Sequence, residues 1–137
     1  DRVTGGGIVP GSFSILTGDP GIGKSTLLLH IAQQLAQSHK VFYFSSEESL
    51  EQVKSRAERL HVGAKNLLFS DDPNLDALIT SCITGKPQAV IIDSIQNCYI
   101  TDSPALSGSV GQLKEAAFKL MRLSKEHRIA VIASGHI

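Results

Sequence analysis

The sequence is poor in cysteine and has no tryptophan, no long hydrophobic run and no net charge. Its 137 residues carry 13 basic and 13 acidic side chains, so contact with a polyanion must come from a local patch or another domain. Cys82 and Cys98 form neither a metal-binding motif nor a disulfide framework, which favours two reduced thiols. No apolar run approaches the roughly 20 residues of a membrane span, and no signal peptide precedes the first motif. We therefore expect a cytoplasmic protein without membrane contact.

The length suits one domain with a core of its own, covering residues 1–137. The chain opens on a glycine cluster, Gly5–Gly7, and stops at Ile137, just beyond an apolar run that is typical of a strand. Natural proteins seldom stop on a buried strand. We therefore expect a piece of a longer protein.

Short β-branched or aromatic runs alternate with longer segments of helical period, which indicates an α/β fold with a parallel sheet flanked by helices. Several of the runs are apolar without alternation, as expected for strands covered on both faces. The predicted strands are Ser12–Thr17, Val41–Ser45, Leu67–Ser70, Ala89–Asp93 and Ile129–Ser134.

The helices between these strands carry start and stop signals. Asn74 is a candidate N-cap of the third helix, and Gly85 followed by Pro87 predicts its end. Ser109 with Gln112 resembles a capping box that opens a long helix through His127. In the first helix, an apolar stripe is predicted to face the core through Leu27, Leu28, Ile31 and Leu35.

A phosphate-binding loop lies between the first predicted strand and the first predicted helix. Residues 18–25 match the pattern GxxxxGK[ST] in full, and the strand–helix context is the one that this motif requires. Glycines let successive backbone N–H groups converge on phosphate oxygens, and the helix adds its positive N-terminal end. Lys24 is expected at the β- and γ-phosphates, and the Ser25 hydroxyl can bind Mg²⁺. The predicted nucleotide-binding residues are Gly18, Asp19, Pro20, Gly21, Ile22, Gly23, Lys24, Ser25 and Thr26.

An apolar strand that ends in an acid provides the second element of such a site. Ala89–Asp93 would deliver the carboxylate of Asp93 at its carboxyl end. Mg²⁺ held by Ser25 and phosphate oxygens keeps several waters, and an acid on a nearby strand can hold those waters. We expect ATP and Mg²⁺ as cofactors, with Ser25 and Asp93 as the metal residues.

Hydrolysis also needs a group that orients and deprotonates the attacking water. Glu47 and Glu48 follow the strand Val41–Ser45, at the sheet edge where ligands bind in open α/β folds. From the residues alone, these acids fit catalysis and the first turn of the next helix equally well. His136 follows the last strand and is a candidate for contacting a phosphate.

Two stretches beyond the phosphate loop give the chain a more specific resemblance. The initial run Gly5–Gly7 within 1–12, and the Asp-Ser-Ile-Gln run at 93–96, are more selective than the loop itself. With further matches at 47–49, 56–60, 108–110 and 135–136, the chain resembles the RecA-like ATPase core of the bacterial RadA (Sms) family of DNA repair and recombination proteins.

The resemblance implies a three-layer, mostly parallel sheet with spatial strand order 3-2-4-5-1. It implies that Glu47 activates water, with Glu48 as the alternative, and that His136 lies beside the γ-phosphate. It also implies a DNA-dependent ATPase that binds ATP and ADP, forms a homohexamer when complete, moves on single-stranded DNA and assists branch migration with a recombinase partner. Asn97–Gly108 corresponds to a DNA-facing loop of the family, although it holds no basic cluster.

Three features of the resembling family are missing from the chain. The family's zinc finger, its Lon-protease-like domain and a Lys-Asn-Arg-Phe motif do not occur in it. Because cationic groups that stabilise phosphoryl transfer often come from a neighbouring subunit, we expect weak turnover from this chain alone. The alternative function is a nucleotide-gated oligomeric regulatory module of the RecA superfamily, in which ATP mainly holds subunits together.

Overall fold

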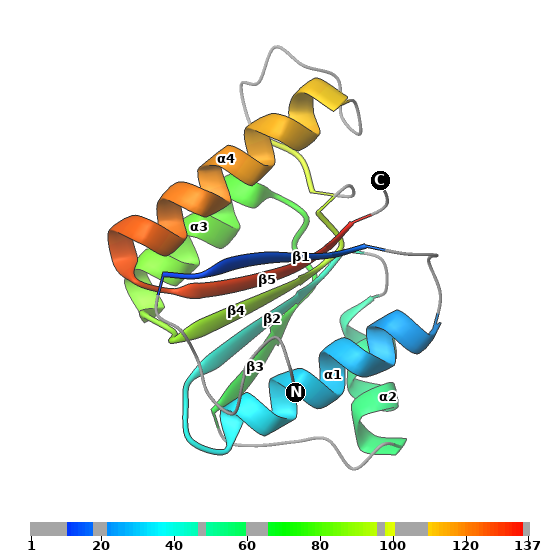
Figure 1. Ribbon diagram of the computed structural model, residues 1–137. Helices are drawn as coiled ribbons and strands as arrows, with labels where there is room; N and C mark the ends of the chain where they lie inside the picture. Colours follow the sequence, from blue (N-terminus) through cyan, green and yellow to red (C-terminus); the bar gives the residue numbers. More distant parts are fainter. Residues whose placement is uncertain are drawn as a thin grey trace.

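The computed structural model describes residues 11–17, 22–46, 49–59, 66–95, 98–100 and 110–135. Strands and helices alternate along these segments (Figure 1). The strands are β1 (Phe13–Thr17), β2 (Val41–Ser45), β3 (Leu67–Ser70), β4 (Ala89–Asp93) and β5 (Ala130–Gly135). The helices are α1 (Ile22–Ala36), α2 (Leu50–Arg59), α3 (Leu75–Gly85) and α4 (Val110–His127).

The five strands form one parallel sheet in the order β1-β5-β4-β2-β3. Read from the other edge, this is the order 3-2-4-5-1 that the resemblance predicted. β5, the last of the described strands, therefore lies between β4 and β1. The predicted strand bounds agree with the structure, with shifts of one residue in β1 and β5.

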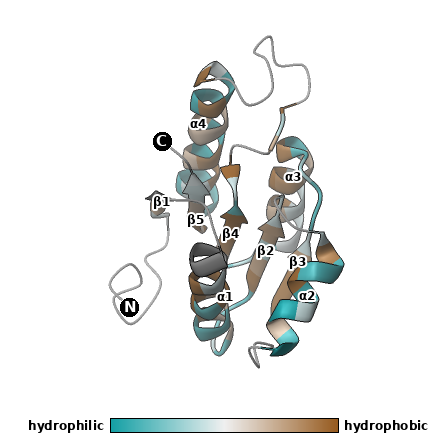
Figure 2. Cartoon of the chain, turned by 90° about the vertical axis from the view of Figure 1, so that its right-hand side faces the viewer, coloured by the Kyte–Doolittle hydropathy of each residue, from teal (hydrophilic) through white to brown (hydrophobic). Residues whose placement is uncertain are grey.

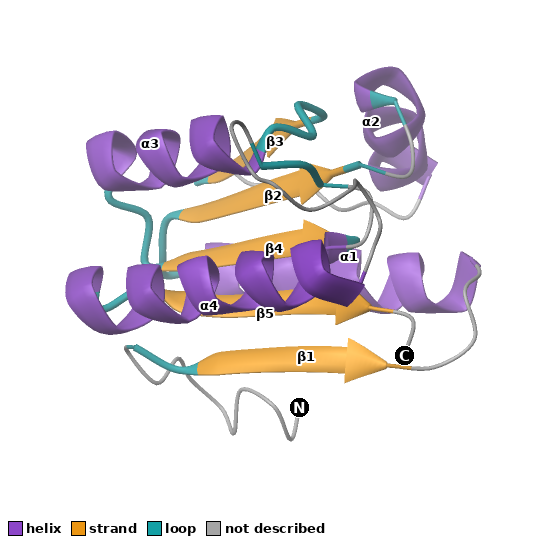
Figure 3. Cartoon of the chain, turned by 90° about the horizontal axis from the view of Figure 1, so that it is seen from above, coloured by secondary structure: helices purple, strands orange, loops and turns teal. Residues whose placement is uncertain are grey.

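Two helices cover each face of the sheet, so the molecule has three layers (Figure 3). One core lies between the sheet and α1 with α2, and includes Leu28, Tyr43 and Ile91. The other lies between the sheet and α3 with α4, and includes Leu78, Ile92 and Leu120. The central strands β2 and β4 are buried at every position, and they are coloured mainly as hydrophobic in Figure 2.

The helix signals in the sequence mostly agree with the structure. The Asn74 side chain caps α3 and accepts hydrogen bonds from the backbone N–H groups of Asp76 and Ala77. The helix ends at Gly85 as predicted, and Lys86 adopts the left-handed conformation, with φ of 52°. α4 runs from Val110 through His127 as predicted, whereas Ser109 lies outside the described residues.

The prediction that Leu27 of α1 faces the core is wrong. Leu27 is 51% exposed, whereas Leu28 and Leu29 are buried. The buried side of α1 continues through Ala32 and Ala36, which places residue 27 on the flank of the helix. Within the described residues, no helix has the length and apolar character needed to cross a membrane.

Candidate functional site

Three buried polar side chains form a row at the carboxyl ends of adjacent strands. Ser45 ends β2 and pairs in register with Asp93, the last residue of β4. Ile92 pairs with Ala133 of β5, so the next residues, Asp93 and Ser134, lie side by side. The row consists of Ser45, Asp93 and Ser134, which are 2%, 2% and 0% exposed.

This row lies on the face of the sheet that α1 covers. Side chains alternate between the two faces of a strand. Tyr43, Ile91 and Ile132 precede the row by two residues on their strands, and all three belong to the core beneath α1. The row is therefore the polar continuation of that core at the carboxyl edge of the sheet.

Asp93 is held on both its side chain and its backbone. The Ser134 hydroxyl donates a hydrogen bond to Asp93 Oδ1 at 2.7 Å. The Asp93 carbonyl accepts from the Ser46 N–H at 2.8 Å. The Ser46 hydroxyl donates to the Ser94 carbonyl at 2.8 Å and accepts from the Ser94 N–H at 3.0 Å. These bonds join the ends of β2, β4 and β5 into one hydrogen-bonded edge.

Helix α1 begins at this same edge, where β1 ends (Figure 3). The backbone of Ile22–Ser25 forms its first turn, which includes the Gly-Lys-Ser part of the phosphate-loop motif. The first N–H groups of an α-helix have no partner within the helix, and its N-terminal end is positively polarised. An anion is therefore favoured beside the start of α1, next to the strand ends that carry the row.

The structure places some of the predicted site residues. Asp93 lies at the carboxyl end of β4, as predicted. Ile22, Gly23, Lys24 and Ser25 lie in the first turn of α1, followed by the half-buried Thr26. The other predicted site residues are outside the described residues, namely Gly18, Asp19, Pro20, Gly21, Glu47, Glu48 and His136.

Ser45 and Ser134 were not among the residues predicted for the site. The only signal for them in the sequence is a serine at the end of an otherwise apolar strand. That signal is weak, because a strand end is an ordinary place for serine. Their alignment with Asp93 follows from the strand order and register, which the residue pattern alone does not contain.

The donor chemistry at Asp93 fits Mg²⁺. This hard cation binds carboxylate oxygens, keeps several waters and needs few protein ligands. Asp93 has a buried carboxylate at the end of β4, hydrogen-bonded to the Ser134 hydroxyl. The part of the chain that the structure describes contains no group of three or more His, Cys, Asp or Glu side chains that could hold a metal. A site with one acid from β4 is consistent with this finding, whereas a zinc site built from the described residues is not.

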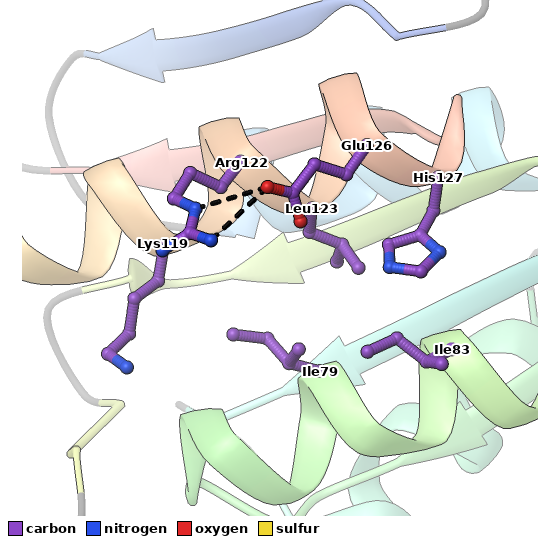
Figure 4. A pocket seen from close by; sticks show the side chains of 7 residues that line it. All are labelled: Ile79, Ile83, Lys119, Arg122, Leu123, Glu126 and His127. Carbon is purple, nitrogen blue, oxygen red and sulfur yellow. Dashed lines mark hydrogen bonds and ion pairs between the residues drawn. The ribbon is translucent and has the colours of Figure 1, made fainter.

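A groove on the opposite face is separate from this edge. It is lined by side chains of α3 and α4 that face one another across it, and its volume is about 170 Å³ (Figure 4). Its charged side chains are paired: Arg122 with Glu126 at 3.2 Å, and Lys119 with Asp76 at 3.7 Å. The groove therefore does not belong to the candidate site. It is lined by Ile79, Ile83, Lys119, Arg122, Leu123, Glu126 and His127.

Sequence comparisons match the chain to a domain family and to named DNA repair proteins. The sequence model of the AAA domain family matches residues 2–137. Proteins named DNA repair protein RadA match the full chain at 48% identity in Listeria monocytogenes, 45% in Streptococcus pyogenes and 42% in Chlamydia pneumoniae. The chain spans 30% of the length of each of these relatives.

Comparison with solved structures supports the fold. The flagellar accessory protein FlaH from Methanocaldococcus jannaschii aligns with a TM-score of 0.69 and 20% identity, over 99% of this chain and 66% of that one. A DnaB-like replicative helicase aligns with a TM-score of 0.74 and 17% identity, over 96% of this chain and 40% of that one. At these identities, the likeness establishes the architecture alone.

Proposed function

The chain belongs to the AAA domain family, and from that premise we propose that it is the Mg²⁺-dependent ATP-binding and hydrolysing core of a RadA-type DNA repair protein. One observation carries the proposal. Asp93 is buried at the carboxyl end of β4, on the face that α1 covers, and the first turn of α1 holds Lys24 and Ser25. The start of α1 attracts a negatively charged phosphate, and the carboxylate of Asp93 attracts a divalent cation, so both groups fit between these elements.

We assign each residue a role from the sequence motifs, together with the position of Asp93 at the end of β4. The backbone N–H groups of 18–25 and the ammonium of Lys24 bind the phosphates of ATP. Ser25 and Asp93 hold Mg²⁺, which supplies positive charge that neutralises the phosphate oxygens. Glu47 orients and deprotonates the attacking water, and Glu48 is the alternative for this role. His136, which follows β5 in the sequence, is proposed as a phosphate contact.

The biological setting is proposed from the relatives' name. A DNA repair protein of this type would couple ATP hydrolysis to movement on single-stranded or branched DNA. It would act in the cytoplasm as a homohexamer with a recombinase partner, and would assist branch migration. The net charge of this chain is zero, so DNA contact is assigned to local patches or to the remainder of the full-length protein. In this view residues 1–137 are its ATPase core.

The test is ATP hydrolysis by the full-length protein with and without single-stranded DNA, combined with titration of a fluorescent ATP analogue. We expect Glu47→Gln to keep nucleotide affinity within about twofold and to lower turnover about 10²-fold or more, because general-base catalysis contributes that much. The matched control is Glu48→Gln, one residue away, which should keep most of the activity.

Three outcomes would change this assignment. Loss of turnover in Glu48→Gln with normal turnover in Glu47→Gln moves the water-activating role to Glu48. Slow hydrolysis that single-stranded DNA does not stimulate favours the regulatory module. Absence of Mg²⁺-dependent nucleotide binding in the wild-type protein contradicts the proposal as a whole.

A further inference from the structure

We propose that Ser134 is a positioning residue for the metal site, because its hydroxyl holds the carboxylate of Asp93 in the orientation that receives Mg²⁺. This inference rests on the proposed function, since it assigns Asp93 to the ion. It adds a residue of β5 to a site that the sequence motifs place on β4 and at the start of α1.

The hydrogen bond is short and protected from water. Ser134 Oγ and Asp93 Oδ1 are 2.7 Å apart, and both residues are almost fully buried. Hydrogen bonds to a carboxylate are about twice as strong as those between neutral groups. Burial removes the water that would compete for the same oxygen and strengthens the bond further.

This bond orients the carboxylate of Asp93. The terminal torsion of an aspartate side chain has a broad energy minimum, so the carboxylate alone does not define where its oxygens point. Ser134 sits on β5, which pairs with β4 and with β1 on its two sides. A hydroxyl fixed on this strand holds Oδ1 and so limits rotation of the Asp93 carboxylate about its terminal torsion.

A second buried serine shows the ordinary alternative. Ser124 in α4 is also 0% exposed, but its hydroxyl donates to the Met121 carbonyl of its own helix at 2.8 Å. That local bond satisfies the hydroxyl without involving another element. Ser134 instead reaches an ionisable side chain on a neighbouring strand, 41 residues away in the sequence. Ser124 is therefore a matched control for the loss of one buried hydroxyl.

The test compares Ser134→Ala with Ser124→Ala in the full-length protein. A fluorescent ATP analogue is titrated in EDTA and then at increasing Mg²⁺, and thermal unfolding is recorded for each variant. We expect Ser134→Ala to raise the Mg²⁺ concentration for half-maximal effect about tenfold, at the lower end of the range for partners that orient metal ligands. Its nucleotide affinity in EDTA should stay within about twofold of wild type, and Ser124→Ala should leave the Mg²⁺ dependence unchanged.

The other possible results distinguish an error in the positioning role from an error in the proposed nucleotide site. If Ser134→Ala has the Mg²⁺ dependence of wild type, or weakens binding equally in EDTA and in Mg²⁺, the positioning role is wrong while the nucleotide site stands. If the wild type itself shows no Mg²⁺-dependent binding, the nucleotide site is wrong and this role falls with it. Should Ser134→Ala fail to fold, Ser134→Cys fills nearly the same volume with a weaker donor. The same rise in the Mg²⁺ requirement is expected there, and its absence overturns the proposal.

Discussion

At the scale of single residues, burial controls the chemistry of the two cysteines. Cys82 and Cys98 are free thiols in the core beneath α3 and α4. Burial raises the pKa of Cys82 from 9.0 to about 12. Burial also raises the pKa of Cys98 to about 11, where Asp72 adds to the rise and a hydrogen bond with Ser46 opposes it. The thiolate is the reactive form of cysteine, so both side chains are expected to be unreactive in the folded protein.

These shifts predict a loss of stability in alkali. The folded-state pKa of each thiol lies above the unfolded value, so the contribution is complete below about pH 9. It is lost as the pH rises from about 9 towards 11 and 12, because only the unfolded chain releases the protons. Urea unfolding measured from pH 8 to 10.5 should show a steeper decline for wild type than for the double variant Cys82→Ala and Cys98→Ala. Equal slopes would contradict the assignment.

At the scale of elements, α3 depends on a cap that the sequence predicted. Asn74 Oδ1 accepts from the N–H of Asp76 at 2.9 Å and from the N–H of Ala77 at 3.3 Å. The same residue forms a backbone bridge with Tyr99, and Leu75 N–H donates to the Tyr99 carbonyl at 2.8 Å. The start of α3 therefore also holds the segment that follows β4, close to the candidate site in the sequence.

We expect Asn74→Ala to lower the free energy of unfolding by about 1 kcal/mol, the usual cost of removing an N-cap side chain. Asn74→Asp keeps an acceptor oxygen at the same position and adds a charge that the helix dipole favours, so it should remain close to wild type. Urea titration followed by circular dichroism measures both variants. If both variants lost a similar amount of unfolding free energy, the side-chain cap would contribute little to stability.

At the scale of the whole molecule, one sheet supports two cores. Ile91 and Ile92 are neighbours on β4, both 0% exposed, and they point to opposite faces. Ile91 packs beneath α1 and α2, and Ile92 packs beneath α3 and α4. The two cores therefore share the backbone of β4 and are expected to unfold together.

Removing one methylene group from either core should therefore lower the free energy of unfolding of the whole molecule. Ile91→Val and Ile92→Val should each lower the free energy of unfolding by about 0.5–1.5 kcal/mol and keep a single transition. Ile83→Val on α3, where the side chain is 42% exposed, should change it much less. Denaturation followed by circular dichroism and by tyrosine fluorescence measures the free energy of unfolding and shows whether there is a single transition. Separate transitions for the two core variants would show that the layers unfold independently.

Much of this organisation was predictable because it is local. Apolar runs such as Val41–Ser45 define strands by composition, and the phosphate-loop motif defines its own place between strand and helix. The strand order was predicted from the family resemblance, since no residue pattern encodes which strands pair. The bond from Ser134 to Asp93 depends on that pairing and on its register, and for this reason it was not predicted. Leu27 was assigned to the core because a stripe of leucines does not define its own edges.

The position of β5 also has a consequence for synthesis on the ribosome. Of the five described strands, β1 is translated before the others, yet within the described segments it pairs only with β5, which is translated after the other four. Helix α1 makes most of its contacts with the sheet through β2, β3 and β4. The two ends of the phosphate loop are thus anchored by parts of the sheet that are completed at different times. We therefore expect a nascent chain to complete the proposed nucleotide site only after Ala130–Gly135 has left the exit tunnel and paired with β1 and β4.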